Sequence, residues 1–320
     1  MQHDSSLKPV VGIDVSKSSL DCFVDLHDQA FAVSNDEAGR TLLIAKLQEF
    51  GVGLVLVEAT GRYHRRLAAD LLDAGIPVAV VNPQRAREFA RSTGKLEKTD
   101  PIDARMLAEF ARAIKHQTLV KGPEKQAELD DLVSRRRSLV QVRVAEKNRQ
   151  GEDLPRLAKQ QSRKLLRLVE QQIEDLDRAI AGLIERDDDW KNKHQIITSI
   201  PGVADTTAHQ LIADLPELGK IDRQQIAKLV GVAPLNCDSG RHRGKRRILG
   251  GRTPVRTALY MAAFNAMKYC PRFVRMAEKL KAAGKPFKVI VTACMRKLLV
   301  TLNQMVKTNT CYQAAFAATN

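Results

Sequence analysis

Short apolar runs alternate with amphipathic stretches between Val10 and about His116. The run Val-Val-Gly-Ile-Asp-Val at 10–15 predicts a buried strand, and apolar residues at helical spacing predict a helix over 37–50. The expected order is strands at 10–15, 20–26 and 30–34, a helix at 37–50, a strand at 53–59, a helix at 63–74, a strand at 77–82 and a last helix from Asp100 onward. This order favours an α/β domain with a mixed sheet.

The pattern changes between about Glu124 and Trp190, where strand signals disappear and charge density rises. Apolar residues there step by four and three, which is typical of a coiled coil or a long helical hairpin. They are Leu165, Val169, Ile173, Leu176, Ile180 and Leu183. Gly151 and Pro155 mark the expected turn between the two helices. Such a hairpin usually serves as a dimer contact or a spacer, and its Lys and Arg residues are also compatible with a solvated face. We expect it to mediate oligomerisation, as a homodimer that assembles to a tetramer.

The chain from Lys191 onward is predicted to be mainly helical, with a glycine- and arginine-rich interruption between Asp238 and Arg252. Residues 199–215 have the form helix, Pro-Gly turn, helix. This segment is similar to a helix-hairpin-helix, but Ala204 stands where a second glycine is usual, so an ordinary αα-turn is equally compatible. We predict three parts, namely residues 1–120, 121–190 and 191–320.

Charge narrows the class of partner. The 320 residues include 52 Lys and Arg against 37 Asp and Glu, a formal net charge of +15. Such a surplus attracts polyanions, and nucleic acid is the first candidate, although a ribosomal or architectural protein would carry the same charge. With 44% hydrophobic and 28% charged residues the chain is typical of folded proteins. Aromatic residues, at 4%, are too few for extensive base stacking.

The cysteines and the N-terminus give no sign of export. No C-x-x-C pair predicts a zinc site or a redox motif, so idle or buried thiols are expected. The five cysteines are Cys22, Cys237, Cys270, Cys294 and Cys311. The first ten residues lack a basic segment followed by an apolar stretch, and no apolar run approaches the roughly 20 residues that span a bilayer. We expect a protein of the bacterial cytoplasm or nucleoid.

Four acidic residues stand at the ends of predicted elements. Asp14 ends the first strand, and Glu58 ends a later strand that can lie beside it in one sheet. Asp100 is a natural N-cap with Pro101 at the first helical position, and Asp103 lies on the same side of that first turn. Each acid alone has an ordinary explanation as a cap, dipole partner, turn former or surface residue. Their joint placement is what a ribonuclease-H-like nuclease needs.

Clustered carboxylates repel one another unless a cation neutralises them, and hard divalent ions prefer oxygen ligands. The predicted ligands of Mg²⁺ or Mn²⁺ are therefore Asp14, Glu58, Asp100 and Asp103. Two such ions about 4 Å apart can activate an attacking oxygen and stabilise a leaving oxygen in phosphodiester cleavage.

Three segments then carry a resemblance to a known family. GIDVSK at 12–17, VEATG at 57–61 and KTDPIDA at 98–104 resemble the three acidic segments of the DEDD insertion-sequence transposases. This is the one-hundred-ten family of insertion sequences, to which the pilin-gene invertases are related. SIPGV, GVAPLNCDSGRHRGK, ILGG and TPVRTALYMAA resemble its C-terminal transposase domain, so nearly the whole chain is covered.

The resemblance implies an enzyme that cuts and rejoins target and donor DNA, with a RuvC-like N-terminal domain. It implies a bridge RNA as the guide, and a composite site in which the metal-binding domain of one subunit meets the serine domain of another. Base pairing would then choose the target, and the protein would need mainly shape and backbone contacts.

The resemblance also implies a nucleophile, Ser239, in the Ser-Gly pair of the C-terminal domain. A serine hydroxyl needs a base, a metal or a strongly positive setting to attack phosphorus. The basic residues expected to hold the scissile phosphate are Arg241, Arg243, Lys245, Arg246, Arg247, Arg252 and Arg256. From the residues alone, a flexible basic loop that grips backbone phosphate is the simpler interpretation. His242 is placed with the phosphate contacts and outside the catalytic set.

Other functions stay open. A structure-specific nuclease such as a Holliday-junction resolvase would use the acidic site alone, and a DNA invertase would need no RNA. An actin-like nucleotide-binding protein would need a further glycine-rich phosphate loop, and none is evident. A non-catalytic nucleic-acid-binding protein would explain the charge but would leave the four acids a coincidence.

Overall fold

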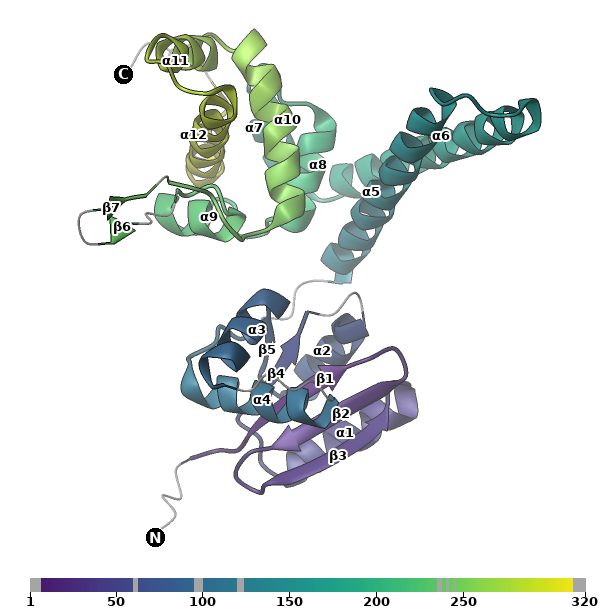
Figure 1. Ribbon diagram of the computed structural model, residues 1–320, viewed down its shortest axis with the longest axis vertical. Coiled ribbons are helices and arrows are strands. Elements are labelled where there is room, and N and C mark those ends of the chain that lie inside the picture. The colour runs from purple at the N-terminus through teal and green to yellow at the C-terminus, as the bar shows by residue number, and fades with distance from the viewer. Residues whose placement is uncertain are drawn as a thin grey trace. The chain divides into compact units, whose positions relative to one another are not determined.

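The computed structural model describes residues 7–59, 63–94, 100–119, 124–234, 238–239, 242–244 and 246–312, with backbone alone for 100–102, 124, 238–239 and 242–243 (Figure 1). Contacts divide the chain into two units, Met1–Gly122 and Pro123–Asn320. The three-part division expected from the sequence stays a prediction, since the contacts group residues 124–185 with the second unit.

The first unit is built on a mixed five-stranded sheet. Its strands are β1 (Val10–Val15), β2 (Ser19–Val24), β3 (Gln29–Ser34), β4 (Leu54–Glu58) and β5 (Val78–Val81). Their order is β3-β2-β1-β4-β5, in which β1 pairs antiparallel with β2 and parallel with β4. Three antiparallel strands extended by two parallel ones are the ribonuclease-H-like arrangement, so the predicted fold class is confirmed.

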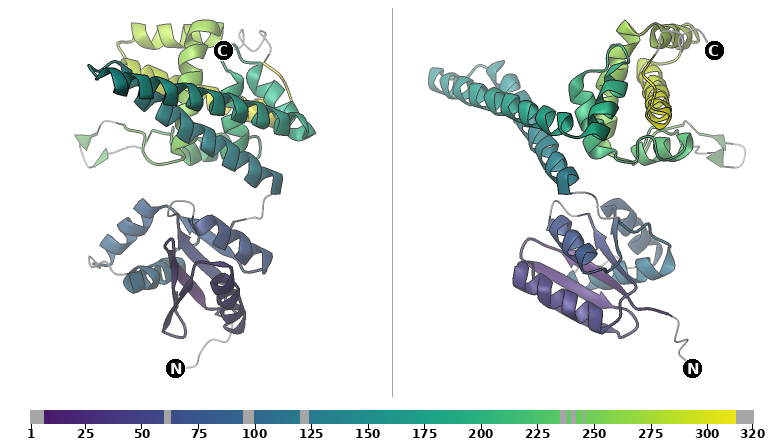
Figure 2. Two further views of the ribbon diagram at one scale, coloured as in Figure 1. Left: turned by 90° about the vertical axis from the view of Figure 1, so that its right-hand side faces the viewer. Right: turned by 180° about the vertical axis from the view of Figure 1, so that it is seen from behind.

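Alternation along the strands produces two buried faces. Val11, Ile13 and Val15 point to one face and pack with Leu43 and Leu67 of the helices behind it. The opposite face is covered by two other helices (Figures 1 and 2). The four helices are α1 (Glu37–Glu49), α2 (Tyr63–Asp73), α3 (Pro83–Ser92) and α4 (Asp100–Ala113), with α1 and α2 on the first face.

Helix α3 is absent from the sequence prediction, which passes directly from the strand at 77–82 to the helix at Asp100. Its start carries ordinary signals, because the Asn82 side chain accepts a hydrogen bond from the Gln84 amide at 2.8 Å and Pro83 occupies the first turn. Ala86 is the helix's one fully buried residue among those described, and the half-buried Phe89 and Ala90 pack on the same core, so α3 has a short apolar stripe that could have identified it.

The second unit is mainly helical, as predicted. Its elements are α5 (Glu124–Gln150), α6 (Arg156–Glu185), α7 (Asp188–Thr198), α8 (Asp205–Asp214), α9 (Arg223–Val230), β6 (Asp238–Ser239), β7 (His242–Arg243), α10 (Thr253–Tyr269), α11 (Pro271–Ala282) and α12 (Phe287–Thr308). Helices α10 and α12 form the centre of its core, and every described helix from α7 to α11 packs on one of them.

Helices α5 and α6 form the predicted long hairpin, with residues 151–155 as its turn (Figures 1 and 2). The apolar seam divides between two cores. Ile180 packs into the main core of the unit, whereas Val169 and Ile173 form a small separate core with Leu139. Leu165 is 41% exposed, whereas Ser162, nearer the turn, is buried against Glu146, so Leu165 does not belong to the packed face of α6.

Helix α12 corrects one expectation about length and hydropathy. It has 22 residues and a window of mean hydropathy 1.3, which by length and composition is enough to cross a membrane. Half of that window is buried inside the unit, where Val291, Leu298 and Leu302 are fully covered. The helix therefore acts as a core element of this fold.

The Pro-Gly turn at 201–202 joins α7 to α8, as predicted. Gly202 has a φ of 93°, and a Cβ on it would lie 2.8 Å from the amide nitrogen of Ala266 in α10. Glycine is required at this position both for its backbone conformation and for its close approach to α10.

Candidate catalytic site

Asp14 and Glu58 lie side by side on one face of the sheet. The parallel register pairs Ile13 with Val57, and the same offset sets Asp14 beside Glu58. In a parallel pair, residues at matching positions point to the same face, with strands about 4.8 Å apart. Val11 and Val55 belong to the opposite face, so both acids point to the face that α3 and α4 cover. The placement expected from the two strand ends is what the register gives.

Gly12 allows α4 to approach this face closely. A Cβ built on Gly12 would lie 2.1 Å from the Ala104 carbonyl oxygen and 2.4 Å from the Ala108 amide nitrogen. No side chain fits between β1 and α4 at this point. Asp103 directly precedes Ala104, so the first turn of α4 lies close to the strand end that carries Asp14. The glycine of the GIDVSK segment thus has a steric role.

Two arginines fix α4 to the hairpin next to β1. The Arg105 guanidinium donates to Asp28 at 2.7 Å and lies 4.2 Å from the centre of the Phe23 ring. Arg112 donates to Asp25 at 2.7 Å. These two contacts hold the middle and the end of α4 against the hairpin, so residues outside the acidic site fix the position of the helix.

The predicted metal ligands are only partly described. Asp14, Glu58 and Asp103 each make an interaction with other residues of the protein. Among the residues described, no three His, Cys, Asp or Glu side chains converge closely enough to hold a metal ion. For Asp100 the backbone alone is described, and it starts α4 at the predicted place within one residue. The donor set still fits a divalent cation, because two carboxylates stand side by side near the start of α4.

Asp21 is an acid on this face that sequence reasoning missed. It pairs directly with Asp14 across β1 and β2, and its carboxylate accepts a hydrogen bond from the Ser19 hydroxyl at 3.0 Å. Leu20 and Cys22 point to the other face, so period-two alternation in this strand could have identified it. Asp21 adds a further negative charge beside Asp14.

The loop of the second unit is closed at its base by glycines. Gly231 ends α9 with a φ of 77°, and a Cβ on Gly251 would lie 2.3 Å from the Gly231 amide nitrogen. The Arg252 amide donates to the Leu229 carbonyl at 3.1 Å. Residues 231 and 251 therefore meet backbone to backbone, and the segment between them leaves and returns at one point.

Ser239 lies in the small hairpin formed by β6 and β7. Its backbone pairs with that of His242, and Asp238 pairs with Arg243. Gly240 and Arg241 connect the two strands and lie outside the described residues. The nucleophile predicted by resemblance is therefore next to the turn of a two-residue-per-strand hairpin.

The predicted phosphate contacts differ in what they do within the protein. Arg252 donates to both carboxylate oxygens of Glu217 at 2.6 Å and to the Asp214 carbonyl at 2.9 Å. Arg256 donates to the Gly250 carbonyl and to Thr253. These two arginines hold the base of the loop. Arg246 and Arg247 are exposed, the side chain of Arg243 is not described, and Arg241 and Lys245 lie outside the described residues.

The described cysteines are unpaired thiols, as expected. Cys22, Cys270 and Cys294 are buried and Cys311 is exposed, while Cys237 lies outside the described residues. Burial raises the pKa of the Cys294 thiol to about 11. A buried thiol that stays protonated is neither a nucleophile nor a metal ligand at neutral pH.

Comparison with known families covers both units. Residues 11–158 match a family model described as a transposase of the DEDD type, and residues 194–277 match one described as the transposase IS116/IS110/IS902 family. The chain is also similar to the pilin gene-inverting proteins of Moraxella bovis and Moraxella lacunata. Each is 26% identical over 312 residues, which cover 94% of this chain and 97% of the relative.

One solved structure, T. thermophilus RuvC in complex with a Holliday junction substrate, matches 35% of this chain and 99% of its own. Identity is 14% and the TM-score is 0.25, so the fold assignment stays with the strand order of the sheet.

Proposed function

Because the chain belongs to the IS116/IS110/IS902 family of transposases, we propose that it cuts and rejoins DNA with two cooperating centres. The first centre would hold Mg²⁺ or Mn²⁺ on Asp14, Glu58, Asp100 and Asp103. The second centre would be Ser239 with the basic residues of its loop. Family membership makes the protein a DNA recombination enzyme, and the two centres are our account of how it works.

The observation that carries the proposal is the register that sets Asp14 beside Glu58 below the start of α4. Two carboxylates on adjacent strands provide oxygen ligands of the kind that a hard divalent ion requires. When bound, such an ion neutralises the carboxylates and stabilises charge on phosphate oxygens. Asp21 makes this requirement stronger, because it adds a negative charge beside Asp14.

In the proposed reaction the Ser239 hydroxyl oxygen attacks the phosphorus of a DNA phosphodiester and loses its proton. The bond from phosphorus to one strand breaks, that strand's oxygen takes up a proton, and the other strand stays attached to the serine. Attack by a hydroxyl of a new DNA end then restores the phosphodiester and the free serine. One phosphate ester is exchanged for another at each step, so no energy source is consumed.

Covalent trapping on DNA tests the two centres separately. Purified protein would be incubated with labelled DNA carrying the element's ends and Mg²⁺ or Mn²⁺, then denatured and run on a gel. Ser239→Ala should abolish the protein–DNA adduct, and Asp14→Asn or Asp103→Asn should abolish metal-dependent cleavage. Ser138→Ala and Glu49→Gln change exposed residues of α5 and α1 and serve as matched controls.

Strand cleavage that survives Ser239→Ala would contradict the serine and favour a plain nuclease that uses the acidic site. Unchanged activity in both aspartate variants would contradict the metal centre. Loss of activity in the two control variants would show a general defect and would remove the support from both.

The proposal extends to a bridge RNA and to assembly of two or more subunits, so that one subunit's acidic centre meets another's serine. RNA sequencing after purification from cells that carry the native flanking DNA tests the guide. A single abundant RNA from that DNA is expected, and a random sample of cellular RNA would contradict it.

A second candidate, DNA inversion without RNA, is favoured by one observation. The pilin gene-inverting relatives are similar over 97% of their length. Recombination of naked DNA by protein that has been treated with ribonuclease would decide for this candidate.

A further inference from the structure

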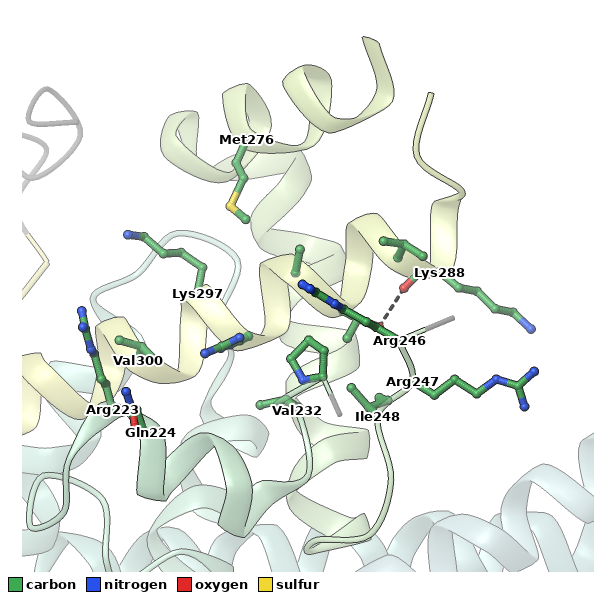
Figure 3. A pocket seen from close by; sticks show the side chains of 15 residues that line it. Arg223, Gln224, Val232, Arg246, Arg247, Ile248, Met276, Lys288, Lys297 and Val300 are labelled. Atoms are coloured by element: carbon green, nitrogen blue, oxygen red, sulfur yellow. Dashed lines mark hydrogen bonds between the residues drawn. The ribbon is translucent and has the colours of Figure 1, made fainter. Parts of the chain in front are cut away.

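A cavity of about 890 Å³ opens in the second unit beside the loop that carries Ser239. It lies between α9, α11 and α12, and residues 246–248 of the chain leaving the loop form its fourth wall (Figure 3). This volume is ample for a small organic group with its substituents, since ligand sites commonly measure roughly 300–1,000 Å³.

The wall of the cavity combines an apolar surface with a purely cationic set of charges. Its apolar side chains include Val232, Pro234, Ile248, Met276, Ala293 and Val300. Its charged side chains are Arg223, Arg246, Arg247, Lys288, Arg296 and Lys297, and no acid stands among the described residues that line it. Burial, and to a lesser degree the like charge of Arg272, lowers the pKa of Lys297, so a bound anion would stabilise its charged form. Such a cavity is complementary to a ligand with a flat or apolar body and anionic groups on it.

The charges extend along the cavity and do not form one compact cluster. In Figure 3, Arg223 and Lys297 extend to one side, Arg247 and Lys288 extend to the opposite side, and Arg246 extends between them. A compact anion such as free phosphate would use only one end. A strand with a phosphate on each side of an apolar group would use both.

We propose that this cavity binds an unpaired nucleotide of a DNA or RNA strand, with the base on the apolar wall and the flanking phosphates on the two cationic ends. The faces of a base are covered in a duplex, so only an unpaired or extruded base can enter such a cavity. The inference rests on the proposed function and deepens it, because Arg246 and Arg247 directly follow the loop of Ser239. The bound strand would pass from the cavity toward that loop.

Fluorescence anisotropy with short labelled strands tests the proposal. The probes are a single-stranded DNA of about twelve nucleotides, the RNA of the same sequence, the DNA duplex, and the same DNA strand with abasic sites. Wild-type protein should bind the base-containing single strand roughly tenfold more tightly than the abasic one, the size typical of contact with one base. The DNA and RNA arms identify which strand the cavity accepts.

Ala293→Phe places a bulky ring on the apolar wall of the cavity and leaves every charge in place. It should remove the tenfold preference for bases and leave the affinity for the abasic strand unchanged, whereas Ala293→Ser should keep the preference. Arg296→Gln should weaken binding of both strands and reduce the dependence of affinity on salt. Lys307→Gln removes an exposed charge from the same helix outside the cavity and should bind as the wild type does.

If Ala293→Phe lowers thermal stability, the binding experiment uses Val289→Glu in its place. Val289 lines the cavity and is 50% exposed, so a polar side chain is tolerated there. It should weaken binding of both strands. Equal wild-type affinity for base-containing and abasic strands would overturn the proposal. So would displacement of DNA by polyglutamate at equal charge, which would point to an acidic protein partner. Adduct formation through Ser239 is measured separately, so each proposal can fail while the other stands.

Discussion

Replacing Gly12 with alanine would test whether the fit of α4 on β1 controls the acidic site. A Cβ at this position would lie 2.1 Å from the Ala104 carbonyl oxygen, whereas real Cβ atoms are essentially never closer than 3.0 Å to a neighbour. Helix α4 must therefore move away by about 0.9 Å, because the opposing atom is backbone and has no rotamer to change. Overpacking of this kind costs roughly 1–3 kcal/mol, and the entropy gained by replacing a strand glycine offsets about 0.5–1 kcal/mol of it.

The effect on activity should exceed the effect on stability. Asp103 moves with α4, and a misplacement of about 1 Å between catalytic groups can reduce a rate on the order of 100-fold. We expect Gly12→Ala to lower the Tm of the first unit by several degrees and to cleave DNA about 100-fold more slowly. Cleavage rates at saturating metal, together with thermal melts by circular dichroism, measure both.

Gly182→Ala is the matched control. Gly182 lies inside α6, where a Cβ would meet nothing within 4 Å, so this variant should keep wild-type cleavage and gain about 0.5–1 kcal/mol of helix stability. A wild-type cleavage rate in Gly12→Ala would refute the reasoning. An equal loss of cleavage activity in Gly182→Ala would also refute it, because the loss would then not depend on the contact between α4 and β1.

Three further outcomes follow from contacts in the second unit. Burial, and to a lesser degree His194, lowers the pKa of His209 from 6.5 to about 4 in the folded protein. Because the unfolded chain then binds the proton more tightly, the free energy of unfolding is highest above pH 6.5. It falls by roughly 3 kcal/mol as the pH is lowered to 4. Urea midpoints at pH 4.5 and 7.5 should therefore differ more in the wild type than in His209→Leu. Arg252→Ala removes the paired hydrogen bonds to Glu217 and should cost about 1–2 kcal/mol, since both side chains are about one third exposed; a double-mutant cycle with Glu217→Ala that gives no coupling would contradict this. Ile173→Ala should cost roughly 2–4 kcal/mol in the small core of the hairpin, seen as faster amide exchange there while the main core keeps its protection.

The elements of the first unit could be predicted wherever a clear apolar period exists. Strand β1 and helix α1 have such periods, and both lie within two residues of their expected bounds. Helix α3 was missed although Asn82 and Pro83 signal a start, because its apolar stripe is short and consists of Ala86, Phe89 and Ala90 alone. In the hairpin, Leu165 fits the heptad spacing yet is exposed, although Ser162 nearer the turn is buried, since spacing alone does not say which positions face the partner helix.

The acidic site was predictable to the extent that strand ends specify it. Asp14 and Glu58 are neighbours because both end adjacent parallel strands, and position along the chain suggests as much. The close fit of α4 on Gly12 is a tertiary contact between residues about ninety positions apart, and no local pattern encodes it. Ser239 was predicted as the nucleophile by resemblance alone, because a Ser-Gly pair in a basic loop has no spacing that distinguishes a nucleophile. The cavity beside it could not be predicted from the sequence, because its wall comes from four segments that are separate along the chain.

Because Gly231 and Gly251 are in contact, the segment between them can be exchanged without moving the helices at its two ends. Its two ends are held together by the core, so its length and composition can change at a cost that rises only by about 0.6 kcal/mol for each doubling of length. A segment of another length or composition, inserted between Gly231 and Gly251, should therefore fold on this scaffold. Evolution within the family can thus vary the loop while the helices below it stay the same.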